Sequence, residues 1–402
     1  MSLDLAHDLL EACAHHEREI VSFLRELIAI PAESGGEGDR CARVLAEYRR
    51  LGFDEAGFDS LGSVVGRIGS GPVTVLMDGH VDCVGVGDPA AWHHDPFRGK
   101  LEGGEVWGRG AVDELPAVAA MPWAARLAAD RGLLDGVTLW VVASVMEEAF
   151  DGFPLQWLIE REGVQPDAVV LGEPTDLAVY RGHRGRMGIE VVAHGVSAHG
   201  AHCDRGVNAV TRIAPVVLDV DALHRHLPAH DVLGKGSVTV SFIECSTASL
   251  NAVPDRARIV LDRRLTAGET PESALAEIRD LRHIGDAEVR TLTSRGQSWR
   301  GVDVELEEAY PTWLLDADHP LVEGVAEAAQ AVLGEAPRLG VWTFSTNGVA
   351  TMGRLGIPTV GFAPGREELA HTTEERVAVA DLLRATAVYA LIPAALARRL
   401  GG

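Results

Sequence analysis

The sequence contains few cysteines, and they form no recognisable pattern. The five cysteines lie far apart in a chain of 402 residues, at Cys13, Cys41, Cys83, Cys203 and Cys245. Because there is no CxxC pair and their number is odd, neither a disulfide framework nor a cysteine zinc site is indicated. The first twenty residues are acidic and helical in pattern, so we do not expect them to form a signal peptide. We therefore expect a cytoplasmic protein.

Basic residues and long apolar runs are also scarce. The chain has 36 Lys and Arg against 59 Asp and Glu, which gives a net charge of −23. Nucleic acids and anionic membranes bind basic patches, so this balance argues against both as partners. No apolar run approaches the roughly 20 residues that a membrane-spanning helix needs. The hydrophobic share of 47% is ample for a packed core, and a chain of this length usually forms two domains.

The first 180 residues alternate between helical and strand patterns. Amphipathic patterns cover 4–30, 41–52 and 117–132, and short apolar runs cover 73–79, 137–145 and 167–174. Such alternation predicts an α/β domain with a mainly parallel sheet covered by helices. In sheets of this kind, functional groups gather just past the carboxyl ends of the strands.

The pattern changes near residue 183. From there the order strand, helix, strand, strand, helix, strand predicts a split ferredoxin-like α+β sandwich. Its second helix should begin with Thr270 as N-cap and Pro271 at the first helical position. We therefore expect a first domain in two parts, 1–182 and 295–402, with the sandwich inserted at 183–294.

Side chains that commonly bind metals follow the predicted strands of the first domain. They are His80, Asp113, Glu148, Glu173 and His371. Taken singly they have ordinary explanations, because "GHVD" fits a polar turn and an Asp at a helix start is usually an N-cap. Together they give two imidazoles and three carboxylates, a set that suits zinc, cobalt or manganese. One bridging carboxylate with one His and one carboxylate for each ion would make a dinuclear site, in which two metals can share and activate a water.

Glu147 and Glu148 stand side by side where the run "VTLWVVASV" ends. We expect the two glutamates to close this strand, and adjacent residues on a strand point to opposite faces. Two neighbouring buried carboxylates would then have different roles.

In the order and spacing of its motifs the sequence resembles the M20 peptidases, a family of dinuclear metal amidohydrolases that includes acetylornithine deacetylase and succinyl-diaminopimelate desuccinylase. The motifs are "GHVD" at 79–82, "GRGAVD" at 108–113, "EE" at 147–148, "GEPT" at 172–175, "SAHGA" at 197–201, "NAVPD" at 251–255, "LDRRLTAGET" at 261–270 and "AHTTEE" at 370–375. The stretch 344–365 is similar to one branch, hydrolases sometimes labelled as linked to selenium metabolism. The resemblance implies a zinc-peptidase-like catalytic domain and an inserted lid that also serves dimerisation.

The resemblance implies two divalent metal ions, zinc first, with cobalt or manganese as alternatives. His80 and Glu173 would bind one ion, Glu148 and His371 would bind the other, and Asp113 would bridge them. After Asp113 the sequence departs from the family, because "ELPAVAAM" stands where relatives carry Lys or a polar residue and then Gly-Gly. We expect the nearby pocket wall to differ.

The same resemblance implies three catalytic roles. Asp82 would orient His80 from behind, and Glu147 would take a proton from the metal-bridging water and pass it to the leaving nitrogen. His199, in the inserted domain, would help stabilise the tetrahedral intermediate, often from across a dimer. Without the resemblance, a His in such a glycine-flanked loop is most simply a solvated turn residue.

Substrate contacts are expected from both domains. Arg264 and Asn251 are candidates for holding a substrate carboxylate or oxyanion, although both could instead stabilise the lid. Asn347, with Ser345 and Thr346, offers neutral hydrogen bonds near the pocket.

The expected function is hydrolysis of a small amide that bears a carboxylate, by a homodimer. N-acyl, N-carbamoyl and dipeptide bonds stay open as alternatives, because deacylases and dipeptidases share these motifs. A catalytically silent binding or regulatory protein with the same fold is the alternative from another class. A nucleotide-binding α/β protein is disfavoured, because no glycine-rich phosphate loop follows the first strand.

Overall fold

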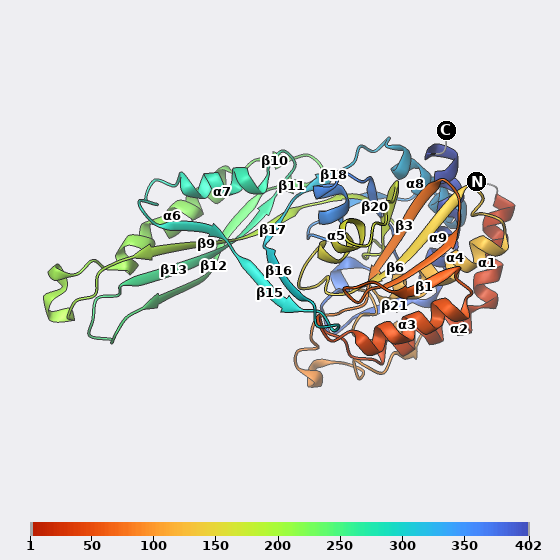
Figure 1. The fold of residues 1–402 in the computed structure, drawn as a ribbon, viewed down its shortest axis with the longest axis horizontal. Coiled ribbons are helices and arrows are strands. Elements are labelled where there is room, and N and C mark those ends of the chain that lie inside the picture. The colour runs from red at the N-terminus through yellow and green to blue at the C-terminus, as the bar shows by residue number, and fades with distance from the viewer. Residues whose placement is uncertain (1–2, 401–402) are drawn as a thin grey trace.

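The computed structural model describes residues 3–400. Figure 1 shows a body that carries both termini and an arm of strands and helices that extends away from it. Each part has its own hydrophobic core of buried side chains. The predicted division at 182/183 and 294/295 stays a prediction, although the second core draws its buried residues from 187–278.

The body is built on a nine-stranded mixed sheet with the order β1-β2-β6-β3-β7-β20-β8-β18, in which β19 pairs with β8. Its strands are β1 Glu55–Phe58, β2 Val64–Gly69, β3 Val73–His80, β6 Val137–Ser144, β7 Ala168–Leu171, β8 Val179–His183, β18 Trp313–Leu314, β19 Leu339–Trp342 and β20 Thr359–Gly361. The four central strands β6, β3, β7 and β20 are mutually parallel. Their burial on both faces agrees with their near-continuous apolar sequences.

Helices pack on this sheet. They are α1 Leu3–His15, α2 Glu17–Ile28, α3 Gly38–Arg50, α4 Leu115–Asp130, α5 Phe153–Glu160, α8 Pro320–Leu333 and α9 Val379–Leu400. The single helix predicted at 4–30 is two helices, because the chain leaves helical geometry at His16. The His16 ring packs on Trp123 of α4, with centroids 4.9 Å apart, so the residue at the break is in contact with the body. No Gly or Pro marks it in the sequence.

Helix α4 is apolar nearly all round and is buried along most of its length, as expected for a helix inside a core. The longest helix, α9, packs against α1, α4 and α8. Among the described residues, α9 alone is long and apolar enough to cross a membrane, yet 72% of that stretch is buried inside the protein. Such burial is typical of a helix in the core of a folded domain.

The arm is a second sheet with the order β12-β13-β9-β14, and β17 also pairs with β9. Its elements are β9 Gly185–His194, α6 Ala209–His226, β12 Ser237–Ser246, β13 Arg256–Leu265, α7 Pro271–Arg279, β14 Glu288–Thr291 and β17 Ala309–Tyr310. This is the strand order of the predicted ferredoxin-like sandwich. Thr270 caps α7 as predicted, since its side chain accepts from the backbone N–H of Ser273.

Shorter elements complete the chain. They are β4 Lys100–Glu102, β5 Glu105–Trp107, β10 Ala229–His230, β11 Gly234–Lys235, β15 Thr293–Gln297, β16 Asp303–Glu307, β21 Arg376–Ala378 and the helical turns η1 Pro89–Ala91, η2 Gly200–Arg205, η3 Val349–Arg354 and η4 Glu367–Leu369. Strand β21 pairs with β5, and this joins the segment after His371 to the segment before Asp113.

Candidate active site

Three central strands end at one edge of the sheet, and their ends carry the predicted ligands. Strands β3 and β6 run parallel with His80 opposite Ser144, and β3 and β7 run parallel with Asp78 opposite Leu171. His80 therefore ends β3, while Glu147 and Glu173 follow the ends of β6 and β7 within three residues. Parallel pairing brings these distant segments together.

Asp113 lies between the two histidines. Its Oδ1 is 3.0 Å from Nε2 of His80, and its Oδ2 is 3.1 Å from Nε2 of His371. Nε2 of His371 is also 3.2 Å from Oε1 of Glu148, and Nε2 of His80 is 3.9 Å from Oε1 of Glu173. The structure thus brings all five predicted ligands into one cluster, with one carboxylate shared between the two imidazoles.

Glu147 is buried beside this cluster, with its Oε2 3.8 Å from Nε2 of His80. Its other carboxylate oxygen, Oε1, is buried without a hydrogen-bond partner. The prediction that β6 continues through Glu147 and Glu148 is wrong, because the strand ends at Ser144. A tight turn with Met146 at φ 62° follows, so the two carboxylates diverge through the turn rather than through strand alternation.

Asp82 holds that turn in place. Its Oδ1 accepts from the backbone N–H of Glu147 at 3.1 Å, and its Oδ2 accepts from that of Glu148 at 3.0 Å. The ring Nδ1 of His80 is 2.9 Å from the backbone carbonyl of Asp82 and 3.7 Å from its carboxylate. A proton on Nδ1 would therefore leave Nε2 of His80 free as a ligand, since the partner of one ring nitrogen fixes the tautomer.

Glu375 fixes the loop that carries Asp113. Its carboxylate accepts from the backbone N–H groups of Val112 and Asp113 at 3.0 and 3.1 Å, and it pairs with Arg109 at 2.6 Å. Burial raises the pKa of Glu375 to about 6. The "AHTTEE" segment thus positions the Asp113 loop as well as supplying His371.

The electrostatics of the cluster match a site for cations. Burial raises the pKa of Glu147 well above its usual range, although the charge of His80 acts in the opposite direction. Burial and the neighbouring Glu114 and Asp113 do the same for Glu173. Hydrogen bonds to Asp113 and Glu148 raise the pKa of His371 to about 10. The imidazole of His371 is therefore protonated in the metal-free chain. Two divalent ions would replace these protons and neutralise the carboxylates, and the mixed His and carboxylate donors suit zinc, cobalt or manganese.

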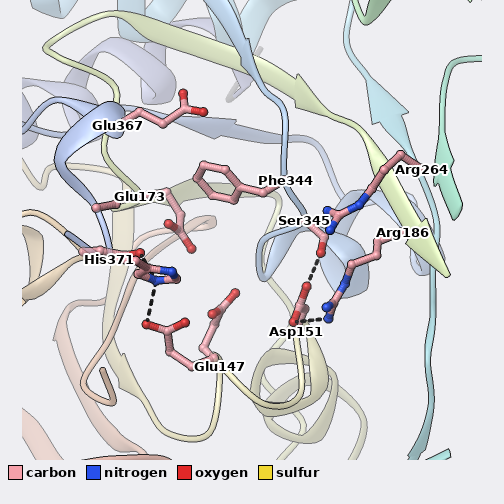
Figure 2. Close-up of a pocket in the computed structure, with 12 residues that line it drawn as sticks. Glu147, Asp151, Glu173, Arg186, Arg264, Phe344, Ser345, Glu367 and His371 are labelled. Carbon is pink, nitrogen blue, oxygen red and sulfur yellow. Dashed lines mark hydrogen bonds and ion pairs between the residues drawn. The ribbon is translucent and has the colours of Figure 1, made fainter. Parts of the chain in front are cut away.

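A pocket of about 430 Å³ opens over the cluster. Figure 2 shows Glu147, Glu173 and His371 on one side and Asp151, Arg186 and Arg264 on the other. The full lining is Asp113, Glu147, Glu148, Asp151, Glu173, Arg186, Arg264, Phe344, Ser345, Glu367, Ala370 and His371. The guanidinium of Arg264 is held by Asp262 at 2.7 and 2.9 Å. A substrate between the two walls would meet donors for a metal at one end and cationic side chains at the other.

Five predicted site residues do not line this pocket. His80 and Asp82 are buried within the cluster, and the other three lie elsewhere. His199 and Asn251 line a separate hollow on the arm, where the backbone N–H of Gly200 donates to the carbonyl of Asn251 at 2.6 Å. Asn347 is buried beneath the pocket, and its amide donates to Asp78 at 2.8 Å and accepts from the N–H of Gly152 at 2.9 Å. Its side chain therefore supports the loop that carries Asp151.

Sequence reasoning did not select Arg186, Asp151 or Glu114. Arg186 is 3.4 Å from Asp151 in the pocket wall, but it stands near the start of β9 and belongs to no motif. Glu114 is buried against His80. The signal for Glu114 was the departure "ELPAVAAM", which placed an additional carboxylate next to the bridging Asp113.

Comparison with known proteins agrees with this arrangement. A sequence profile of the family described as Peptidase family M20/M25/M40 matches residues 76–395. The chain is 41% identical over 387 residues to YgeY of Escherichia coli K12, described as uncharacterized, with 96% of each chain covered. It is 30% identical over 356 residues to succinyl-diaminopimelate desuccinylase of Methylobacterium nodulans, with 84% of each chain covered. The structure of Bacillus subtilis YXEP, described as a dinuclear metal binding peptidase from the M20 family, matches with a TM-score of 0.72 at 14% identity, covering 96% of this chain and all of that one (100%). This likeness confirms the predicted fold class.

Proposed function

This chain belongs to peptidase family M20/M25/M40 and is a metal-dependent hydrolase of amide bonds, and we propose that it cleaves a small, amino-acid-derived amide that carries a carboxylate. The observation that carries this proposal is the Asp113 carboxylate shared by His80 and His371, with the unpartnered oxygen of Glu147 beside it. A silent binding protein would have no need for that free carboxylate oxygen.

We infer that two ions, zinc by preference, fit this donor set. His80 and Glu173 would hold one ion, Glu148 and His371 the other, and Asp113 would be shared, in keeping with the distances between them. When bound, such ions polarise a carbonyl and lower the pKa of water. His80, Asp113 and Glu173 are buried, while His371 is exposed at the pocket. The buried ligands would keep bulk water away from one side of these charges, which strengthens their effect.

Glu147 is suited to move the proton. Its Oε1 has no partner, so it can accept a proton from the attacking water and hold it. Burial raises the pKa of this carboxyl, which favours uptake of the proton that it would then donate to the leaving nitrogen. A single group can thereby act first as base and then as acid.

The direct test of this function is a screen of N-acetyl, N-succinyl and N-carbamoyl amino acids and of dipeptides, with zinc, cobalt and manganese supplied separately. Metal-dependent hydrolysis within one of these classes is the expected result. Binding of such compounds without turnover under every metal would instead favour the silent binding protein.

Arg264 should bind the substrate carboxylate. Replacing it by Gln removes a charged hydrogen bond worth about 1.5–3 kcal/mol, so KM should rise roughly 10- to 150-fold with a smaller change in kcat. Steady-state kinetics on the best substrate measure both. Arg295→Gln, on the exposed β15 and paired with Glu305, is the matched control. An unchanged KM in Arg264→Gln would assign the carboxylate to another residue.

We also propose that the arm forms a homodimer. Strand β12 is an edge of its sheet, and its side chains Phe242 and Ile243 are 46% and 58% exposed. Long apolar edge strands invite pairing with another chain, and contiguous exposed apolar side chains indicate an interface. Since His199 lies on the arm and outside its own pocket, a second copy is the route by which it can reach an active site.

Mixing two inactive variants tests that route. Glu147→Gln lacks the base and His199→Ala lacks the arm histidine, but a mixed dimer would contain one site with both groups. Refolding or exchanging the two variants together should restore about a quarter of wild-type activity, as expected for random pairing in a twofold dimer. Light scattering measures the dimer itself. A monomeric mass, or no recovery from exchanging dimers, would contradict action of His199 across subunits.

A further inference from the structure

Glu114 is a buried carboxylate in the site to which the proposed reaction gives no role. It is 2% exposed, and within residues 3–400 its recorded side-chain contacts are both with His80. Its Oε1 accepts from the backbone N–H of His80 and lies 3.9 Å from Nε2 of the same residue. Its other oxygen, Oε2, is buried without a partner. Such a group is costly to bury unless something compensates it.

The position of Glu114 in its helix makes the missing partner more significant. Glu114 is the N-cap residue of α4, a position where Ser, Thr, Asp or Asn side chains accept from the first free N–H groups of the helix. Its side chain makes no such bond and turns toward His80 instead. At Gly172, an added Cβ would lie 3.2 Å from Oε2 of Glu114 and 2.3 Å from Cβ of Ala117. A side chain at position 172 would therefore clash with Ala117 and come into tight contact with this carboxylate.

The surroundings of Glu114 are rich in negative charge. One ligand atom each from His80, Glu114 and Glu173 lie within 4.8 Å of one another, and His80, Asp113 and Glu148 form a second group of this kind. His80 is common to both groups. Glu114 is thus close enough to the donor atoms of one metal position to share it.

We propose that Glu114 is a sixth protein ligand of the metal centre, binding the ion that His80 and Glu173 hold. The inference rests on the proposed function and adds an asymmetry to it. Counting the shared Asp113 for both ions, the ion beside His80 would have one imidazole and three carboxylates as ligands. The ion beside His371 would have one imidazole and two carboxylates. Because manganese prefers oxygen ligands more than zinc does, the position beside His80 should accept manganese more readily than the other.

The test compares wild type with Glu114→Gln. Gln keeps an oxygen that can accept from the His80 N–H, so a residue that only positions His80 would be replaced with little loss. Gln cannot replace a carboxylate that binds the metal. If Glu114 is a ligand, one of the two zinc affinities should therefore fall about 10- to 100-fold, as measured by competition with a chromophoric chelator. The visible spectrum of the dicobalt form should change, since it reports the ligands, and manganese should be lost first from the weakened position.

Asp78→Asn is the matched control. Asp78 is also buried, has one unpartnered oxygen and lies two residues before His80, but it belongs to neither group of ligand atoms. It should keep both affinities and the cobalt spectrum. Thermal melts guard against simple misfolding. Without metal, Glu114→Gln should melt at or above the wild-type temperature, because a carboxylate that is costly to bury is gone. With zinc, the melting temperature of the variant should rise by less than that of wild type.

Wild-type affinities and an unchanged cobalt spectrum in Glu114→Gln would overturn the inference and leave the proposed function intact. A lower melting temperature of the variant both with and without zinc, at unchanged affinity, would overturn it as well. Failure of the wild-type protein to bind two ions would count against the proposed function itself.

Discussion

Glu147→Gln is expected to lower kcat by about 10²- to 10⁴-fold, the usual contribution of a positioned general acid and base, while both metal positions remain filled. The carboxylate is buried, with one oxygen 3.8 Å from Nε2 of His80 and the other unpartnered. Gln has nearly the same shape and can still occupy this space. It cannot take up a proton, so both the attack of water and the departure of the nitrogen lose their proton carrier. The measurement is steady-state kinetics with metal analysis of the same sample.

The neighbouring Glu148→Gln is the natural control, because it should fail differently. Its carboxylate contacts Nε2 of His371 at 3.2 Å, so its replacement should weaken one metal position and be partly rescued by excess metal. Glu147→Gln should show no such rescue. If added zinc restored Glu147→Gln, or if that variant lost metal, Glu147 would be a ligand and the base would have to be sought elsewhere.

These two carboxylates also show what the sequence can and cannot predict. Its position after a buried parallel strand was enough to select Glu148 as a candidate ligand, as were the positions of His80 and Glu173, whereas Glu147 was assigned its role through the family resemblance. Strand patterns and parallel topology determine where such ends meet. The divergence of Glu147 from Glu148 was assigned to strand alternation, and it comes instead from a turn with Met146 at φ 62° whose N–H groups are held by Asp82. Non-glycine residues with positive φ leave little trace in sequence.

Residues that reach the site through tertiary structure were harder to find. Arg186 lines the pocket from the start of β9 in the arm, beside Asp151 of the body, and no motif in the sequence marks that contact. For His199 and Asn251 the sequence and the structure differ in the other direction. Their motifs identified them as site residues, but in a single chain they line a hollow separate from the pocket. Motif order records which residues a family shares, but it does not record the distance across which they act.

Removal of metal should abolish activity and destabilise the protein together. The site concentrates carboxylates that burial keeps from water, and a cluster without cations must take up protons to remain folded, as the raised pKa values of Glu147 and Glu173 indicate. An ion present at about a thousand times its dissociation constant stabilises the folded state by about 4 kcal/mol. Dialysis against a strong chelator should therefore lower the melting temperature by several degrees and reduce turnover to background.

Stepwise return of metal gives this prediction its sharpest form. Activity should recover only as the second equivalent of zinc, cobalt or manganese binds, because Asp113 spans two histidines rather than serving one. Titration followed by kinetics and by melting would show stability rising from the first equivalent and turnover from the second. Each ion should also displace protons from the cluster. A pH-indicator dye in weakly buffered solution would measure the protons released. Full activity after exhaustive chelation, or full activity at one equivalent, would rule out the dinuclear mechanism, since the shared carboxylate would then have no second ion to serve.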